Sequence, residues 1–148
     1  MKLAVGSDHR GFANKSELVA ALKKSGHEVT DVGTYAAEPP CDYPEIALKV
    51  GREVSSRRAE KGILVCKSGI GMSIAANKVR GVRAALVQDL ESALLSRRHN
   101  DANVLVLGSE KFEGPLGPAV EAWLREPFEG GRHERRVSQI TKIEKETL

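Results

Sequence analysis

Short apolar runs alternate with longer segments whose apolar residues recur every three or four positions along the whole chain. A short run of β-favouring residues between turn residues predicts a buried strand, whereas the longer spacing predicts an amphipathic helix. The predicted strands cover residues 2–6, 27–32, 62–66, 82–87 and 103–107. This alternation indicates an α/β fold, in which right-handed crossovers join a parallel sheet covered by helices on both faces.

The predicted helices each present one apolar stripe to the sheet. Pro44 stands in the first turn of the second helix, where proline is allowed, and Asp89 is the expected cap of the fourth. Residues 33–42 form the longest irregular stretch, because Pro39 and Pro40 exclude regular structure. The stripes are Phe12, Leu18, Val19 and Leu22; Ile46, Ala47, Val50 and Val54; Met72, Ala75, Ala76 and Val79; Leu90, Ala93 and Leu94; and Ala119, Ala122 and Trp123.

A last predicted helix, residues 132–146, differs from the others because it is mostly polar. Its apolar seam consists of Val137, Ile140 and Ile143, which is too little to cover much of a sheet. We therefore expect this helix to pack across a subunit boundary rather than on its own sheet.

Length and composition limit the class of protein. The 148 residues suffice for one domain, residues 1–148, with a substantial core. With 41% hydrophobic and 29% charged residues, the chain suits a soluble enzyme or binding domain. The net charge of +3 gives no electrostatic argument for a nucleic-acid partner.

Targeting signals and cysteine usage point to the cytoplasm. The N-terminus has no signal-peptide core, and no apolar run approaches the ~20 residues needed to span a bilayer. Two cysteines, Cys41 and Cys66, are too few for a disulfide framework, so we expect reduced thiols. No pair of His or Cys residues shows metal-ligand spacing, and we expect no metal.

The segment 66–71 joins a predicted strand to a predicted helix. Cys66 ends the strand, and Gly69 and Gly71 permit a tight turn and the close approach of a ligand. Free N–H groups at the helix N-terminus can hold an anion and, together with Lys67, favour a thiolate. Cys66 is therefore a candidate nucleophile or base.

Other reactive residues follow other strands at the same edge of the predicted sheet. Asp8 and His9 follow the first strand, and Ser109 follows the fifth. Ligands of open parallel sheets bind beyond the carboxyl ends of the strands, at the point where the strand order reverses. These residues and Cys66 are thus expected to lie around one binding site.

Each candidate also has an ordinary structural role. A cysteine at the end of a buried strand is usually a small core residue, and Asp8 could merely cap the first helix. His99 stands at the end of a helix, where capping explains it as well as catalysis does. Arg132 and Arg136, one helical turn apart, are either solvated or suited to clamp a phosphate.

Six short motifs stand in register between Lys2 and about Ile143: residues 7–11, 42–44, 66–78, 81–85, 98–103 and 129–136. Together they resemble the ribose-5-phosphate isomerase B family, which includes the galactose-6-phosphate isomerase subunits. The resemblance implies a Rossmann-like three-layer α/β/α sandwich with a five-stranded parallel sheet. It also implies that residues 132–146 form an interface helix in a homodimer with shared active sites, and two such dimers can pair into a tetramer.

The activity implied by the resemblance is interconversion of ribose 5-phosphate and ribulose 5-phosphate through an enediolate, without metal or cofactor. Neither nucleic acid nor membrane is an implied partner. Cys66 matches the base that moves a proton between C1 and C2, and His99 matches the group that helps open the furanose ring. Ser68 and the amides of Gly69, Ile70 and Gly71 match the cradle for the enediolate oxygens. The remaining expected substrate contacts are Asp8, His9, Lys67, Asn100, Arg132 and Arg136.

Three positions depart from the family's pattern. Lys67 replaces a common glycine, Ser68 replaces a common threonine but keeps the hydroxyl, and Glu110 stands where several members have a basic residue. An isomerase of another phosphorylated sugar, such as allose, galactose or tetrose phosphate, is therefore an alternative. A non-catalytic phosphate- or nucleotide-binding module is a second alternative, although residues 69–71 lack the third glycine of a dinucleotide fingerprint.

Overall fold

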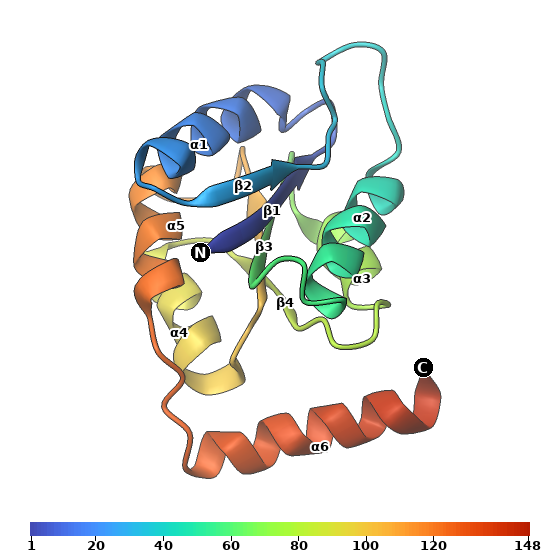
Figure 1. The fold of residues 1–148 in the computed structure, drawn as a ribbon, viewed down its shortest axis with the longest axis vertical. Coiled ribbons are helices and arrows are strands. Elements are labelled where there is room, and N and C mark those ends of the chain that lie inside the picture. The colour runs from blue at the N-terminus through green and yellow to red at the C-terminus, as the bar shows by residue number, and fades with distance from the viewer.

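Five strands form one parallel sheet in the computed structural model, which describes residues 1–148 (Figure 1). The strands are β1 (Lys2–Ser7), β2 (Glu28–Asp31), β3 (Lys61–Cys66), β4 (Ala84–Val87) and β5 (Val104–Gly108). They lie in the order β2-β1-β3-β5-β4, and every neighbouring pair is parallel. The predicted α/β fold with a five-stranded parallel sheet is confirmed.

Helices cover both faces of this sheet. They are α1 (Phe12–Lys24), α2 (Tyr43–Ser55), α3 (Ile70–Ala76), α4 (Leu90–Asn100), α5 (Leu116–Arg125) and α6 (Arg132–Thr147). Because successive strand residues point to opposite faces, Ile63 and Val65 pack in the cluster that includes α1, α4 and α5. Leu64 and Cys66 pack in the cluster that includes α2 and α3. The two clusters make the molecule a three-layer sandwich.

Most of the predicted stripe residues are buried, but two details differ from the expectation. Leu90 is 46% exposed. Helix α3 ends at Ala76 rather than continuing to Val79. The reason is Asn77, whose side-chain amide bonds both the N–H and the C=O of Ala84 at 2.9 Å and so draws the chain toward β4.

Lys15 is a charged residue on the buried face of α1, and the apolar pattern did not reveal it. Its side chain is 1% exposed, and its Nζ lies 2.8 Å from Asp31 Oδ2. The same ammonium donates to the carbonyl of Thr34 at 2.6 Å. A buried charge needs such partners, and these contacts attach the irregular segment 33–42 to α1.

Helix α6 stands apart from both faces of the sheet and lies across one end of the molecule (Figure 1). Its seam is poorly covered: Ile140 is 45% exposed and Ile143 is 59% exposed. An apolar groove of about 380 Å³ separates α6 from the start of β4. Packing of this helix on a second subunit therefore stays a prediction, and the exposed seam is compatible with it.

The strand order reverses between β1 and β3, so the predicted switch point lies between the end of β1 and the end of β3. The segment after β1 contacts the end of β3, since a Cβ at Gly11 would lie 2.5 Å from the carbonyl oxygen of Val65. None of the helices is long and apolar enough to cross a membrane.

Candidate active site

Cys66 lies at the carboxyl end of β3, and a backbone amide points at its sulfur. The N–H of Gly69 donates to Sγ at 3.0 Å. Gly69 has a φ of +81°, and a Cβ there would also lie 2.4 Å from a methyl group of Leu86. Glycine is therefore required at position 69 both for the turn and for space. The predicted tight turn after Cys66 is present, and it directs a donor at the thiol.

Burial raises the pKa of the Cys66 thiol above its ordinary value. The side chain is 5% exposed, and the nearby carboxylate of Asp8 raises the pKa further, while the N–H of Gly69 opposes both effects. The expectation that this environment favours a thiolate at rest is therefore wrong. The reason is that desolvation of a charged sulfur outweighs the backbone hydrogen bonds that Gly69, Ser68 and Met72 offer it. A thiolate that does form here is, however, a stronger base, because burial raises the pKa of its conjugate thiol.

Lys67 does not help to activate the thiol. Its ammonium lies 3.6 Å from Glu110 Oε2, and both side chains are more than half exposed. The backbone keeps the pair in register, because the N–H of Glu110 donates to the carbonyl of Lys67 at 3.2 Å. Two of the three departures from the family's pattern, Lys67 and Glu110, are thus partners of one another at the mouth of the site.

Asp8 and His9 are fixed by backbone amides at the end of β1. The N–H of Gly11 donates to Asp8 Oδ1 at 3.0 Å, in the turn before α1. The N–H of Cys41 donates to His9 Nδ1 at 3.3 Å. Since Nδ1 accepts this bond, the ring proton is assigned to Nε2, which leaves His9 a donor toward a ligand.

The expected cradle after Cys66 is partly occupied by the protein's own groups. The N–H of Gly69 is directed at the sulfur, and that of Ile70 approaches Ser68 Oγ at 3.3 Å. A Cβ at Gly71 would lie 2.4–2.7 Å from the ring and hydroxyl of Tyr43. Tyr43 therefore borders the cradle. It belongs to the motif 42–44, but the sequence pattern alone assigns it no role in the site.

The other predicted site residues lie at the opposite end of the sheet. Helix α4 ends with His99 and Asn100, just before β5 begins, and Arg132 and Arg136 stand exposed on α6. Cys66 pairs with Gly108, whereas the amino end of β5 pairs with β3 four residues earlier. At about 3.3 Å per residue the two ends are roughly 13 Å apart along the strands. One chain alone does not bring the two groups together.

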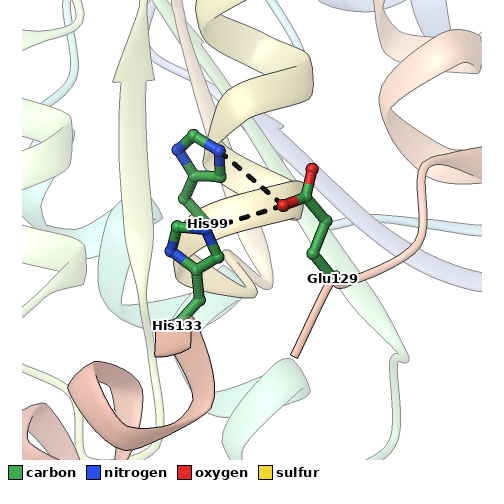
Figure 2. Close-up of side chains that lie close together, drawn as sticks. All are labelled: His99, Glu129 and His133. Atoms are coloured by element: carbon green, nitrogen blue, oxygen red, sulfur yellow. Dashed lines mark ion pairs between the residues drawn. The ribbon is translucent and has the colours of Figure 1, made fainter. Parts of the chain in front are cut away.

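At that opposite end, His99 lies against two residues that the sequence reasoning missed, Glu129 and His133 (Figure 2). One ligand atom from each lies within 4.8 Å of the others. Two imidazoles and a carboxylate are a donor set that zinc accepts. The rings, however, are stacked with centroids 4.2 Å apart and planes 9° apart. Imidazole lone pairs lie in the ring plane, so near-parallel rings do not both point at one ion.

The thiol of Cys66, the carboxylate of Asp8 and the imidazole of His9 lie at the switch point of this parallel α/β sheet. The fold and these groups define a class of α/β proteins with a reactive small-molecule site. Such a site suits acid–base chemistry on a small ligand held beyond the strand ends. The chain belongs to the Ribose/Galactose Isomerase family, whose model matches residues 3–140. The family inferred from the six motifs is confirmed.

Individual relatives cover almost the whole chain. Ribose-5-phosphate isomerase B of Escherichia coli K12 is 48% identical over 144 residues, which are 97% of this chain and 96% of the relative. The structure of the Clostridium thermocellum enzyme of the same name has a TM-score of 0.95 at 46% identity and covers both chains fully. A Mycoplasma genitalium structure, solved with bound ribulose-5-phosphate, has a TM-score of 0.94 at 39% identity and covers 99% of this chain and 97% of that one.

Proposed function

We propose that this protein interconverts ribose 5-phosphate and ribulose 5-phosphate by proton transfer through an enediolate, with Cys66 as the base and without a metal or cofactor. Family membership supports the reaction class, and the names of the relatives support this pair of substrates. The observation that carries the mechanism is the contact between Gly69 N–H and Cys66 Sγ at 3.0 Å. It places a donor where the base must bear a negative charge.

The chemistry needs both a base and donors. A proton next to a sugar carbonyl is weakly acidic, so the barrier falls when preorganised donors meet the charge that develops on the enediolate oxygens. In this proposal the Ser68 hydroxyl and the amides of residues 69–71 receive those oxygens, and the Gly69 N–H is shared between the sulfur and the substrate. Asp8 and His9 contact the sugar, and Lys67 lies at the mouth of the site as a further contact.

We also propose that a second copy of the chain completes each site. His99 and Asn100, together with Arg132 and Arg136 as phosphate ligands, are roughly 13 Å of strand away from the Cys66 end. A two-fold dimer places the α4–α6 end of one protomer beside the Cys66 end of its partner and forms two equal sites. The exposed seam of α6 and the groove beside β4 offer the apolar surface for this contact.

The first experiment measures ribulose 5-phosphate formed from ribose 5-phosphate in EDTA. The wild type turns over, and Cys66→Ala lowers kcat by roughly 10²–10⁴, the usual contribution of a positioned base. Ribulose 5-phosphate is open-chain because its C5 oxygen carries the phosphate, so solvent deuterium entering its C1 reports enolisation alone. Exchange at an undiminished rate in Cys66→Ala contradicts the role of this base.

A second experiment tests the shared site. Cys66→Ala and Arg136→Ala homodimers are each expected to be nearly inactive, and mixing them restores one native site per heterodimer. A Cys66→Ala and His99→Asn pair complements in the same way. If mixed dimers form without regaining activity, the arginine and histidine serve their own chain's site and the shared arrangement is wrong.

The role of His99 is separable from that of Cys66. As the group that helps open the furanose ring, His99 acts before enolisation. His99→Asn is then expected to slow turnover of ribose 5-phosphate more than deuterium exchange into ribulose 5-phosphate. Equal losses in both assays contradict this division between ring opening and enolisation.

A second candidate function is isomerisation of another phosphorylated sugar. The observation that favours it is the Lys67–Glu110 pair, which places one cation and one anion at the mouth of the site. Comparing kcat/KM for phosphorylated pentoses, tetroses and hexoses decides between the candidates. Turnover of any of them also excludes a non-catalytic binding module.

A further inference from the structure

His99 and His133 come from different helices and lie face to face where α4 meets the start of α6 (Figure 2). Their ring centroids are 4.2 Å apart and their planes differ by 9°. The His133 side chain is 6% exposed, whereas that of His99 is 37% exposed. The buried His133 ring therefore packs beneath the more exposed His99 ring, and we refer to it as the floor of the stack.

Glu129 lies at the edge of both rings. Its Oε2 is 3.5 Å from His133 Nε2 and 4.0 Å from His99 Nε2. Its backbone N–H donates to the carbonyl of Arg98 at 3.1 Å, so the residue that bears the carboxylate is attached to the last turn of α4. The Nε2 edges of the two rings thus face one carboxylate, whose backbone is attached to α4.

The surroundings of the buried His133 ring disfavour its protonated form. Burial lowers the pKa of His133, and the neighbouring groups His99, Arg132 and Arg136 lower it further, against the opposing effect of Glu129. The positive end of the α6 helix dipole, which lies at the first turn, also disfavours a proton on His133. A neutral imidazole can lie under another ring whether or not that ring carries a proton, without charge repulsion.

We propose that His133 and Glu129 are positioning residues for His99: the stacked floor and the carboxylate hold its ring in one orientation for acid–base work on the sugar. The inference rests on the proposed role of His99 in opening the furanose ring. A histidine at the exposed end of a helix otherwise samples several rotamers. Proton transfer requires the ring nitrogen within hydrogen-bond reach of the sugar oxygen, so loss of orientation lowers kcat rather than binding.

The test compares two substitutions at position 133 and reads both halves of the reaction. His133→Ala removes the floor, and His133→Phe keeps a flat ring of similar size without nitrogens. For ribose 5-phosphate, His133→Ala is expected to lower kcat about ten- to hundredfold with KM within about twofold. His133→Phe retains kcat within about threefold, and deuterium exchange into ribulose 5-phosphate changes less than about twofold in both. Arg135→Ala, an exposed neighbour on the same helix, is the matched control.

A double-mutant cycle separates positioning from a general structural role. If His133 acts through His99, then His133→Ala causes almost no further loss when His99→Asn is already present. The same loss in both backgrounds overturns the proposal, as does a His133→Phe variant as impaired as His133→Ala. A rise in KM without a change in kcat overturns it too, because it assigns His133 to substrate binding. Glu129→Gln is expected to lower kcat for ribose 5-phosphate about three- to thirtyfold, and an unchanged kcat removes Glu129 from the proposal.

Proton NMR of the His99 ring tests its stacking on His133 without measuring turnover. A ring lying on another aromatic ring shows an upfield ring-current shift, which is expected in the wild type and in His133→Phe and absent in His133→Ala. A wild type that shows the shift but does not isomerise ribose 5-phosphate contradicts the proposed function alone. An active wild type without the shift contradicts this inference alone.

Discussion

The raised pKa of Cys66 predicts how activity depends on pH. The ordinary thiol pKa is 9.0, and burial raises it in this protein. At pH 7 the thiol of the free enzyme is therefore mostly protonated, and the thiolate fraction grows nearly tenfold for each pH unit below the pKa. If the thiolate is the base, kcat/KM rises roughly tenfold per unit between about pH 6.5 and 8.5.

The thiol can be titrated without substrate by its rate of alkylation with iodoacetamide. A Cys41→Ser background leaves Cys66 as the single reacting thiol. Alkylation is expected to be slow at pH 7, because the sulfur is both protonated and only 5% exposed, and to accelerate up to and beyond pH 9. The pH profile of alkylation and that of kcat/KM should rise in parallel.

Substitution of Asp8 is expected to change the pKa of Cys66 in a known direction. Its carboxylate raises the pKa of Cys66, so Asp8→Asn lowers that pKa and speeds alkylation at pH 7.5. The matched control is Glu91→Gln, which removes an exposed carboxylate that does not affect the thiol. A plateau in alkylation rate below pH 8, or an Asp8→Asn variant that reacts more slowly, refutes the account of the thiol given above.

Three further predictions concern stability. Trp123 is fully buried, and Trp123→Ala is expected to cost about 3–5 kcal/mol in urea unfolding; a loss below 1 kcal/mol contradicts its place in the core. Asp31→Asn leaves the buried Lys15 ammonium without its carboxylate and is expected to destabilise the fold by about 3 kcal/mol, whereas Lys15→Met costs less. The folded-state pKa of His133 lies below its ordinary value of 6.5, so the unfolded chain takes up the proton first as pH falls. His133→Phe should therefore gain stability relative to the wild type between about pH 7.5 and 5.5, and an equal pH dependence of both proteins contradicts this.

Several features of the site follow from interactions within a few residues, and for this reason the sequence alone predicts them. Asp89 caps α4 because Ser92, three residues later, donates its N–H to the carboxylate at 2.7 Å. The turn after Cys66 follows from Gly69, whose positive φ few other residues adopt. Alternation of strands and helices then requires a parallel sheet, and a parallel sheet brings Asp8 and Cys66 to the same edge.

Features that depend on distant segments were decided only by the tertiary structure. Strand β5 lies between β3 and β4, and no local pattern in the sequence specifies this order. Lys67 was expected beside the thiol but pairs with Glu110, and the stack of His99 and His133 joins residues on two different helices.

What the sequence determined by itself is the succession of elements, the edge of the sheet that carries Cys66, and the family that the motifs resemble. The tertiary structure decided the direction in which the pKa of Cys66 is shifted, the neighbours of His99 and the separation of the two groups of site residues. The physical reason is that backbone conformation and hydrophobic periodicity are encoded over a few residues. Burial, charge environment and aromatic contacts depend on which remote parts of the chain share one region of space.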